Sequence, residues 1–441
     1  MHIISLGCSK NLIDSEVMGG LLSKSGLQLV DQTGAADIVI VNTCAFINPA
    51  KEEALEEILT LVEEKKKATR NFQIIVAGCL AQRYGKELFS QIPEVDLFIG
   101  TGEVGNIVEH VNKLNQEKFR RAAVITKPDF LMTARHERVL SSTAVSTFLK
   151  ISDGCSNCCS YCAIPSIRGH ARSRMPGDIL KEAVNLAARG IKEIIITGQD
   201  TTAYGLDLKG QPRLSELLTG MTKIKSIKWI RLLYAHPAHL TGEVLSTIAA
   251  NKKICRYIDL PIQHIDDTIL QSMGRNVAAA QIKEIINQAR KIMPDVALRT
   301  SLIVGFPGET KKRFERLLDF VREIKFDHLG VFTYSREDGT KAAEFKSQIS
   351  EVEKERRREI IMIEQAAISN AINKNLIGSI QEVLIEEKSD RADFAWMGRC
   401  RRQAPEIDGI TYIKSGQNQI GKIVKCEITD ADDYDLFAEI L

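Results

Sequence analysis

Two long stretches of this chain alternate short apolar, strand-like runs with segments of helical spacing, and this alternation limits the possible folds more than any other feature. In the first stretch, helix-like segments at residues 15–25 and 49–69 separate the runs. Strands separated by helices of ten residues or more indicate βαβ units and a parallel sheet. We therefore predict an N-terminal α/β domain over residues 1–120. Its predicted strands are residues 2–6, 37–41, 72–77 and 95–99.

The second stretch repeats the same alternation six times, which predicts a partial (β/α)6 barrel, shorter than the eight-fold form. We place this domain at residues 141–350. Its helices include residues 176–189, 278–293 and 311–324. Its strands are residues 147–151, 193–197, 229–233, 257–260, 297–304 and 328–334.

The C-terminal part has a different pattern. Residues 349–376 form a charged amphipathic segment, which we interpret as a connecting helix. Residues 377–441 show apolar alternation interrupted by glycines, as at Gly378, Gly409, Gly416 and Gly421. This pattern is typical of a small antiparallel β-barrel. Three domains also suit a chain of 441 residues.

Composition excludes several classes. A net charge of +2 with 26% charged residues argues against a generally basic DNA-binding protein. No run of about 18 apolar residues predicts a membrane span, and the first residues enter an apolar strand without the basic region of a signal peptide. We therefore expect a cytoplasmic protein.

Ten cysteines in that compartment indicate metal binding or catalysis rather than disulfides, although an isolated cysteine is as readily a small buried apolar residue.

Cys155, Cys159 and Cys162 have C-x3-C-x2-C spacing directly after the first predicted barrel strand, at the end where barrel enzymes keep their chemistry. Three such thiolates can bind three irons of a [4Fe–4S] cluster and leave the fourth iron open. Structural zinc is the alternative, but it normally takes four ligands in two C-x-x-C pairs. Cys158 offers a second frame with Cys162, yet no cysteine lies two residues beyond Cys162.

Cys8, Cys44 and Cys79 each end a predicted strand of the N-terminal domain. The carboxyl ends of parallel strands line one edge of a sheet, with neighbours about 4.8 Å apart, so these thiols can converge on a second cluster with an open iron. Three core cysteines placed there by chance are the alternative. We assign no ligand role to the remaining cysteines: Cys158, Cys255, Cys400 and Cys426.

The C-x3-C-x2-C motif with Tyr161 before its last cysteine resembles the radical S-adenosylmethionine superfamily. The resemblance implies that S-adenosylmethionine chelates the open iron and yields a deoxyadenosyl radical that removes hydrogen from an unactivated carbon. Residues 197–200 lie where the superfamily often has Gly-Gly-Glu, and of these only Gly198 matches. Residues 303–309 resemble the adenine-contacting strand end, with a plain strand-to-helix turn as the alternative. The cofactor contacts expected from this resemblance are Gly198, Gln199, Gln263, Gly305 and Glu309.

The three-domain arrangement resembles the methylthiotransferases, which join an N-terminal three-cysteine domain to a radical barrel and a C-terminal TRAM β-barrel. One branch modifies an adenosine of tRNA, and the other modifies an aspartate of the twelfth small-subunit ribosomal protein. Residues 6–16, 198–205 and 404–409 look like the ribosomal-protein branch. The resemblance then implies two [4Fe–4S] clusters, a hydrogen taken from the aspartate β-carbon, a methylated sulfur delivered by the N-terminal cluster and a methyl group from a second S-adenosylmethionine. Sulfur and electron donors are further expected partners of what we expect to be a monomer.

The charge of the C-terminal domain favours the same branch. Residues 377–441 hold 13 Asp or Glu against 8 Lys or Arg, and residues 426–441 hold six acidic residues and no basic one. Such a surface repels phosphate and suits a basic protein, although a solvated acidic tail has the same composition. Arg399, Arg401 and Arg402 around Cys400 are predicted to add basic charge near this surface. An alternative function of a different class is a non-catalytic nucleic-acid-binding protein with structural zinc. The predicted six-stranded barrel argues against it, because such a protein does not need this domain.

Overall fold

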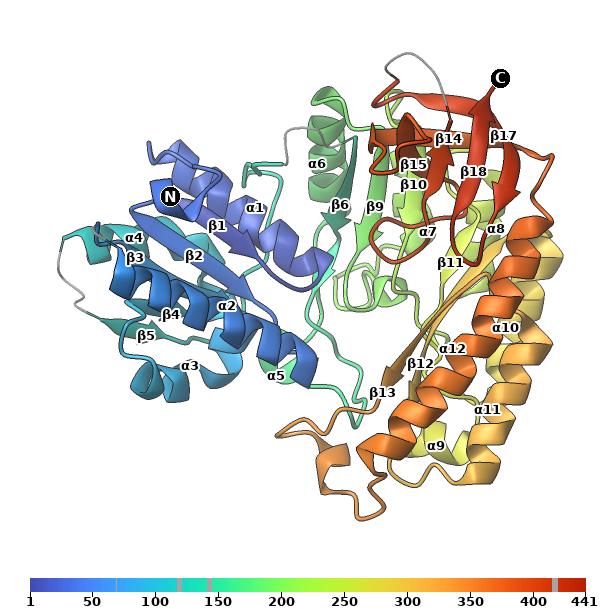
Figure 1. Cartoon of the computed structure of the whole chain (residues 1–441), viewed down its shortest axis with the longest axis horizontal. Coiled ribbons are helices and arrows are strands. Elements are labelled where there is room, and N and C mark those ends of the chain that lie inside the picture. Colours follow the sequence, from blue (N-terminus) through green and yellow to red (C-terminus); the bar gives the residue numbers. More distant parts are fainter. Residues whose placement is uncertain (69, 117–120, 141–144, 415–418) are drawn as a thin grey trace.

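The computed structural model describes residues 1–68, 70–116, 121–140, 145–414 and 419–441. It consists of an N-terminal α/β domain, a partial barrel and a small C-terminal β-barrel (Figure 1), as the sequence predicts. The predicted domain limits at residues 120 and 141 fall outside the described residues and stay predictions. No helix of the described chain is both long and apolar enough to cross a membrane.

The N-terminal domain is a five-stranded parallel sheet in the order β1-β2-β3-β4-β5. Successive side chains of a strand point to opposite faces, so Ile38 and Ile40 of β2 pack with α1 and α4, while Val39 and Val41 pack with α2 and α3. Its strands are β1 (His2–Ser5), β2 (Ile38–Thr43), β3 (Gln73–Gly78), β4 (Leu97–Ile99) and β5 (Ala122–Val124). Its helices are α1 (Ser9–Lys24), α2 (Asn48–Lys67), α3 (Cys79–Gln91) and α4 (Ile107–Asn115).

The six predicted barrel strands form two parallel sheets, β10-β9-β6 and β11-β12-β13. A bridge between Ile230 and Ile254 joins the sheets, so the six strands form one curved wall. The strands are β6 (Ser146–Lys150), β9 (Glu193–Thr197), β10 (Trp229–Leu232), β11 (Tyr257–Asp259), β12 (Ala297–Val304) and β13 (His328–Thr333). The helices are α5 (Ile164–Arg168), α6 (Pro176–Ala188), α7 (Leu214–Thr222), α8 (Gly242–Ala250), α9 (Asp267–Ser272), α10 (Ala279–Ile292) and α11 (Lys311–Ile324), with a short hairpin of β7 (Ser152–Asp153) and β8 (Arg172–Ser173).

Helix α12 (Glu351–Lys374) packs along β13 and leads into the C-terminal domain. This domain is a closed barrel in the order β14-β15-β16-β18-β17. Four of its strand pairs are antiparallel, as predicted, and the β16–β18 pair is parallel. Its strands are β14 (Ile380–Lys388), β15 (Trp396–Cys400), β16 (Thr411–Ile413), β17 (Ile423–Ala431) and β18 (Leu436–Ile440).

The C-terminal domain closes the amino ends of the barrel strands. Arg399 pairs at 2.6 Å with Glu193, the first residue of β9, which also pairs at 2.8 Å with Arg231 of β10. Arg402 pairs with Asp327 just before β13. The prediction that Arg399 and Arg402 add basic charge near the surface of the C-terminal domain is therefore wrong, because both pair with carboxylates of the barrel domain. Arg401 pairs instead with Glu382 of the C-terminal domain, at 2.8 Å.

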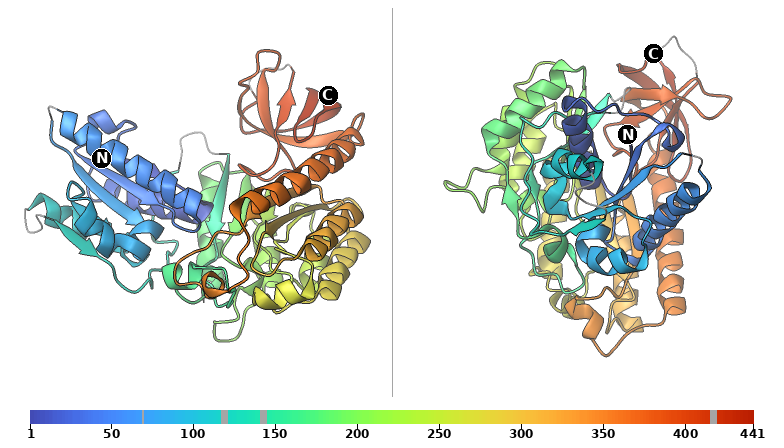
Figure 2. Two further views of the ribbon diagram at one scale, coloured as in Figure 1. Left: turned by 60° about the horizontal axis from the view of Figure 1, so that its bottom comes forward. Right: turned by 90° about the vertical axis from the view of Figure 1, so that its left-hand side faces the viewer.

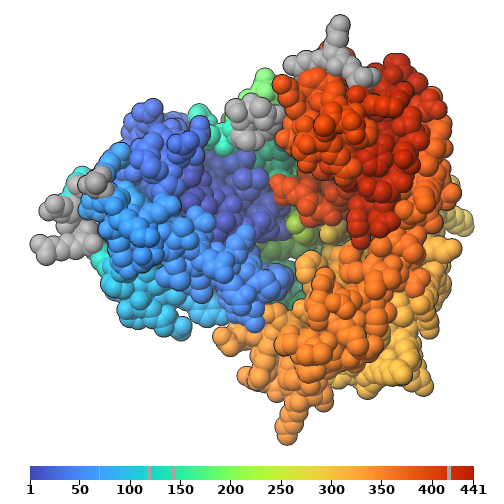
Figure 3. Space-filling view, viewed as in Figure 1, coloured from blue at the N-terminus to red at the C-terminus, as the bar shows by residue number. Residues whose placement is uncertain are grey.

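The N-terminal domain covers the opposite end, where the barrel strands finish. The hydroxyls of Ser9 and Thr197 are 3.2 Å apart, and Asp14 pairs at 2.6 Å with Lys150 at the end of β6. Figures 1 and 2 show the N-terminal sheet beside the barrel, at a distance from the C-terminal domain. In the space-filling view, a hollow separates the N-terminal domain from the C-terminal half, with residues of the barrel at its floor (Figure 3).

Candidate functional site: two cysteine triads at one domain interface

The structure brings Cys8, Cys44 and Cys79 to one edge of the N-terminal sheet, after β1, β2 and β3. Cys8 is the N-cap of α1, and Cys79 is the first residue of α3. Both thiols therefore lie at helix amino termini, where unpaired backbone N–H groups favour negative charge. The predicted placement at the carboxyl ends of neighbouring strands is confirmed, and the role of the three cysteines as metal ligands stays a prediction.

Glycines precede two of these cysteines for steric reasons. Gly7 has φ +88°, and a Cβ built on it would lie 2.5 Å from Cβ of Cys44. Gly78 has φ +91°, and its Cβ would lie 2.3 Å from Oδ1 of Asn42. Only glycine adopts this backbone without strain and admits such close neighbours. The two glycines thus turn the chain from strand to helix and let the cysteines approach one another.

The three thiols interact electrostatically. Burial raises the pKa of Cys8, but the Lys10 ammonium, the Arg168 guanidinium and nearby backbone N–H groups lower it more, so the net pKa lies below the ordinary value. Burial and the charge of Cys8 raise the pKa of Cys44. Burial, opposed by Arg168, raises the pKa of Cys79 to about 12. A metal that binds all three thiolates must therefore displace protons.

Arg168 joins this triad to the barrel domain. Its Nη2 lies 3.7 Å from Sγ of Cys79 and donates to Oδ1 of Asn11 at 2.5 Å. Its Nη1 pairs with Asp14 at 2.7 Å and with Asp153 at 3.2 Å. Asp153 also accepts from the backbone N–H of the residue that precedes Cys155. A continuous polar network therefore runs from one cysteine triad to the loop of the other.

The loop of Cys155, Cys159 and Cys162 is fixed by backbone contacts. The N–H of Cys155 donates to the carbonyl of Gly169 at 3.0 Å, and the N–H of Cys162 donates to the carbonyl of Cys159 at 3.1 Å. The hydroxyl of Ser160 donates to the carbonyl of Ser272 at 2.7 Å. Cys158, in contrast, is exposed, so its side chain points away from the buried side of the loop.

Burial raises the pKa of two thiols of the second triad, as it does for Cys44 and Cys79 of the first. Burial raises the pKa of Cys155, and the nearby Asp200 raises it further. Burial, with the charges of Cys159 and Cys155, raises the pKa of Cys162 to about 12. Nη1 of Arg275 lies 4.0 Å from Sγ of Cys159 and provides a positive charge beside the thiolates.

Two of the predicted cofactor contacts lie beside this loop. A Cβ on Gly198 would lie 2.8 Å from the Ser152 hydroxyl, so no side chain fits there. Nε2 of Gln199 donates to Oδ1 of Asp153 at 3.1 Å. Its Oε1 is buried and accepts no hydrogen bond within the described chain. Such an orphaned acceptor matches a ligand amine.

The other three predicted contacts have partners in the protein or an unusual backbone. Glu309 pairs with Arg357 at 3.0 Å and accepts from the N–H of Gly305. It also lies 3.4 Å from Nε2 of His264. These contacts account for its burial as part of a strand-to-helix turn, and a role in cofactor binding stays a prediction. Gln263 has φ +70° and forms a parallel bridge with β12.

One cluster of polar side chains was not predicted from the sequence, and it holds the Cys155 loop through a hydrogen bond from Asn157. Asp200, His236 and His239 place ligand-type atoms within 4.8 Å of one another. Oδ2 of Asp200 accepts from Asn157 at 2.8 Å and lies 2.7 Å from Nδ1 of His239, while Oδ1 accepts from Thr202. Burial lowers the pKa of His236 to about 3. The only signal in the sequence was the position of Asp200 at a strand end.

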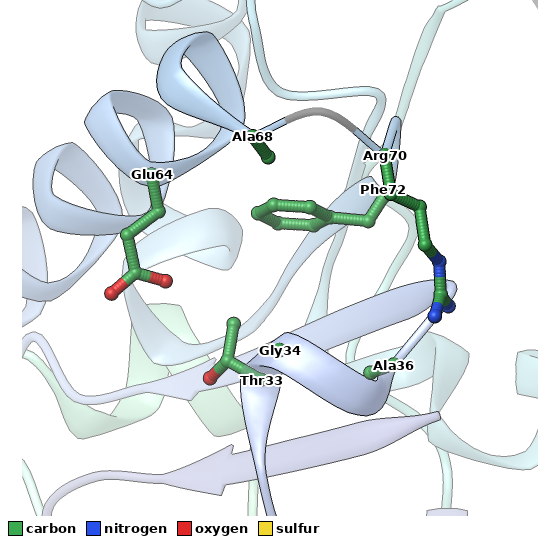
Figure 4. Close-up of a pocket in the computed structure, with 7 residues that line it drawn as sticks. All are labelled: Thr33, Gly34, Ala36, Glu64, Ala68, Arg70 and Phe72. Carbon is green, nitrogen blue, oxygen red and sulfur yellow. The ribbon is translucent and has the colours of Figure 1, made fainter.

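A cavity of about 210 Å³ lies elsewhere, beside the amino ends of β2 and β3 (Figure 4). That edge of the sheet is opposite to the edge that carries the cysteines. The cavity is therefore separate from the two triads. Its lining residues are Thr33, Gly34, Ala36, Glu64, Ala68, Arg70 and Phe72.

Family models match all three domains. A model of the uncharacterized protein family UPF0004 matches residues 1–100, one of the radical SAM superfamily matches 149–321, and one of the TRAM domain matches 377–441. A ribosomal protein uS12 methylthiotransferase RimO from Syntrophus aciditrophicus is 53% identical over 445 residues, covering 100% of this chain and 98% of the relative. The chain belongs to the ribosomal protein uS12 methylthiotransferase family. Another such methylthiotransferase, from Geobacter sulfurreducens, is 47% identical over 441 residues, covering 100% of this chain and 98% of the relative.

Solved structures support the fold of this family member. The radical S-adenosylmethionine methyltransferase TsrM from Kitasatospora setae, with cobalamin and a [4Fe-4S] cluster bound, aligns with a TM-score of 0.56 at 13% identity. The alignment covers 88% of this chain and 81% of TsrM. At this identity, the likeness concerns the architecture alone.

Membership implies [4Fe–4S] clusters and S-adenosylmethionine, and the residues present fit these groups. Each triad supplies three thiols, which suits a cluster with one open iron. Arg168 and Arg275 lie beside the thiols and offset the negative charge of thiolate ligands. The orphaned Oε1 of Gln199 offers an acceptor for an amino group next to the Cys155 loop.

Proposed function

We propose that this enzyme transfers a methylthio group to the β-carbon of an aspartate in ribosomal protein uS12 by radical S-adenosylmethionine chemistry. The observation that carries the proposal is the shared buried network of Arg168, which contacts Cys79 of one triad and Asp153 beside the other. Two such sites on one network suit a reaction that needs a radical and a sulfur donor at the same carbon. The similarity to uS12 methylthiotransferases over 100% of the chain supports the choice of substrate.

The residues have separate tasks in this proposal. Cys155, Cys159 and Cys162 would hold one cluster, and Gln199 would accept a hydrogen bond from the amino group of S-adenosylmethionine. Cys8, Cys44 and Cys79 would hold the other cluster. The bound clusters and S-adenosylmethionine supply the hydrogen abstraction and sulfur chemistry that ordinary side chains cannot perform.

The domain interface adds positioning and protection. Arg168 stabilises the Cys79 thiolate, while Asp14 and Asp153 neutralise the buried guanidinium. Because the N-terminal domain packs on the carboxyl ends of the barrel strands, the cysteines of both triads are buried or partly buried. Exclusion of water protects a reactive radical from side reactions.

The experiment compares the two branches of the larger family directly. Anaerobically reconstituted enzyme is incubated with S-adenosylmethionine and a reductant, together with either recombinant uS12 or unmodified tRNA. We expect mass spectrometry to find a methylthio group on one aspartate of uS12 and none on tRNA. Methylthiolated adenosine in the tRNA, with uS12 unchanged, would refute the proposal.

A further inference from the structure

Lys10 is a buried cation without an anionic partner. It is 8% exposed, and its Nζ lies 3.5 Å from the centroid of the Tyr234 ring. Its side chain also interacts with that of Tyr234 through a hydrogen bond, and no carboxylate of the described chain forms an ion pair with this ammonium. Its contact with the ring is a cation–π interaction, which compensates only part of the lost hydration.

The other buried lysines of the described chain show what a satisfied ammonium looks like in this protein. Nζ of Lys150 donates to two carboxylates, at 2.6 and 2.9 Å. Nζ of Lys354 donates to a carboxylate at 2.6 Å and to a backbone carbonyl at 2.8 Å. A buried charge without such partners is unfavourable unless something else supplies them. Lys10 therefore lacks an oxygen anion.

The charged residues around Lys10 do not supply this missing oxygen anion. The titratable groups that act most strongly on the Lys10 charge are the Tyr234 hydroxyl, the thiol of Cys8 and the guanidinium of Arg168. Asp14, the acidic residue closest to Lys10 along α1, is already paired with Lys150 and Arg168. An incoming ligand with a carboxylate would complete the site.

Tyr234 is held in place for this contact. It follows β10 and has φ +58°, a left-handed conformation that is strained for an aromatic residue. Its N–H donates to Oδ2 of Asp259 at 2.9 Å, and its carbonyl accepts from the N–H of Thr201 at 3.0 Å. Strained residues that are fixed in this way cluster at binding sites.

We propose that Lys10, held against Tyr234, binds the side-chain carboxylate of the substrate aspartate. This inference rests on the proposed function. The β-carbon that receives sulfur is bonded directly to that carboxylate, and Lys10 is two residues from Cys8. An ion pair there would set the β-carbon beside the N-terminal triad while the Cys155 loop faces it from the barrel.

The methionine carboxylate of S-adenosylmethionine has the same chemistry, so the test must separate the two sources. Its expected place is the Cys155 loop of the barrel, whereas Lys10 belongs to the N-terminal domain beside Cys8. This difference in position favours the substrate carboxylate.

The experiment measures equilibrium binding of uS12, with Asp or Asn at the modified position, to anaerobic holoenzyme with S-adenosylmethionine and without reductant. Asn keeps the shape of Asp and removes the charge. We expect wild-type enzyme to bind the Asp form about 10- to 100-fold tighter, as for a hydrogen bond to a charged group. In Lys10→Met, this ratio should fall close to one. Lys24→Met, at the exposed end of the same helix, should keep the wild-type ratio.

Iron content and S-adenosylmethionine affinity of each variant are measured in parallel. Support requires that Lys10→Met keeps both while it loses the Asp preference. The proposal is overturned if wild-type enzyme binds both forms within twofold, or if Lys10→Met keeps the preference. Loss of iron in Lys10→Met would assign the lysine to the cluster. Loss of S-adenosylmethionine binding with the Asp preference intact would assign it to the cofactor. Either result overturns the proposal. If wild-type enzyme modifies no aspartate at all, the proposed function fails instead.

Discussion

The guanidinium of Arg168, on a helix of the barrel domain, lies 3.7 Å from Sγ of Cys79, which belongs to the N-terminal domain. Residues 89 positions apart in the chain therefore share one buried site. Arg168 follows the Cys155 loop by a few residues, so the segment that carries one triad also supports the other. This contact links the geometry of the two predicted cluster sites.

Replacing Arg168 with Met should destabilise the protein by about 3–5 kcal/mol, because Asp14 and Asp153 would lose a buried partner. Denaturant unfolding of the apoprotein measures this loss. Arg322→Met, on the exposed surface of α11, should destabilise the protein far less, because a surface ion pair contributes little. Adding Asp14→Asn to Arg168→Met should recover part of the loss, and a double variant that is less stable than the single one would contradict this account.

Replacing Cys159 with Ala should abolish cleavage of S-adenosylmethionine, because two remaining thiolates cannot hold the cluster that reduces it. Deoxyadenosine released in the presence of a reductant is the readout. Cys158→Ala is a closely matched control, since Cys158 is the adjacent residue and its side chain is exposed. Equal cleavage by both variants would remove Cys159 from the ligand set.

Replacing Gly7 with Ala should lower the iron content of the N-terminal site, because the new Cβ would overlap Cβ of Cys44 at 2.5 Å. Gly26 has nearly the same φ, +89° against +88°, but its built Cβ meets nothing within 4 Å. Gly26→Ala should therefore cost only the backbone strain, about 1–2 kcal/mol, and keep its iron. Iron analysis of the two purified variants checks the difference, and equal iron in both would show that the close approach to Cys44 is unimportant.

The attachment of the C-terminal domain should weaken in acid. Burial raises the pKa of Glu193, but Arg399 and Arg231 lower it more, so the folded pKa lies below the ordinary value. A carboxylate with a depressed pKa contributes stability above its unfolded pKa, about 4.3, and loses that contribution as pH falls through the folded pKa. The difference in melting temperature between wild type and Glu193→Gln should thus be largest near neutral pH and shrink below about pH 4. A difference that stays constant with pH would contradict the ion-pair interpretation.

Periodicity predicted the elements whose burial follows a regular apolar pattern. Strands β9 and β12 and helix α11 have the predicted bounds, because their apolar residues repeat at strand or helix spacing. Helix α1 begins at Ser9 rather than at residue 15. Its first turns bury Lys10, Asn11 and other polar residues against the barrel, so no apolar repeat marked them. Strands β5, β15 and β18 were missed as well.

The placement of Cys8, Cys44 and Cys79 was predictable because strand ends of a parallel sheet meet at one edge. That of Cys155, Cys159 and Cys162 was predictable because their C-x3-C-x2-C spacing keeps them on one loop. The partners of Asp14, Lys150 and Arg168 were not, since these residues come from different domains and only the packed interface brings them together. For the same reason, Arg399 looked like a surface charge although it pairs with Glu193 of the barrel. Local sequence patterns do not predict contacts between residues that lie so far apart in the chain.

The central claim is that the two triads do different work in one reaction, and Cys44→Ala tests it most directly. A single anaerobic reaction of this variant with uS12, S-adenosylmethionine and a reductant is analysed for deoxyadenosine and for methylthiolated aspartate. We expect deoxyadenosine to form while no methylthiolated product accumulates. Methylthiolated uS12 at the wild-type level would contradict the account.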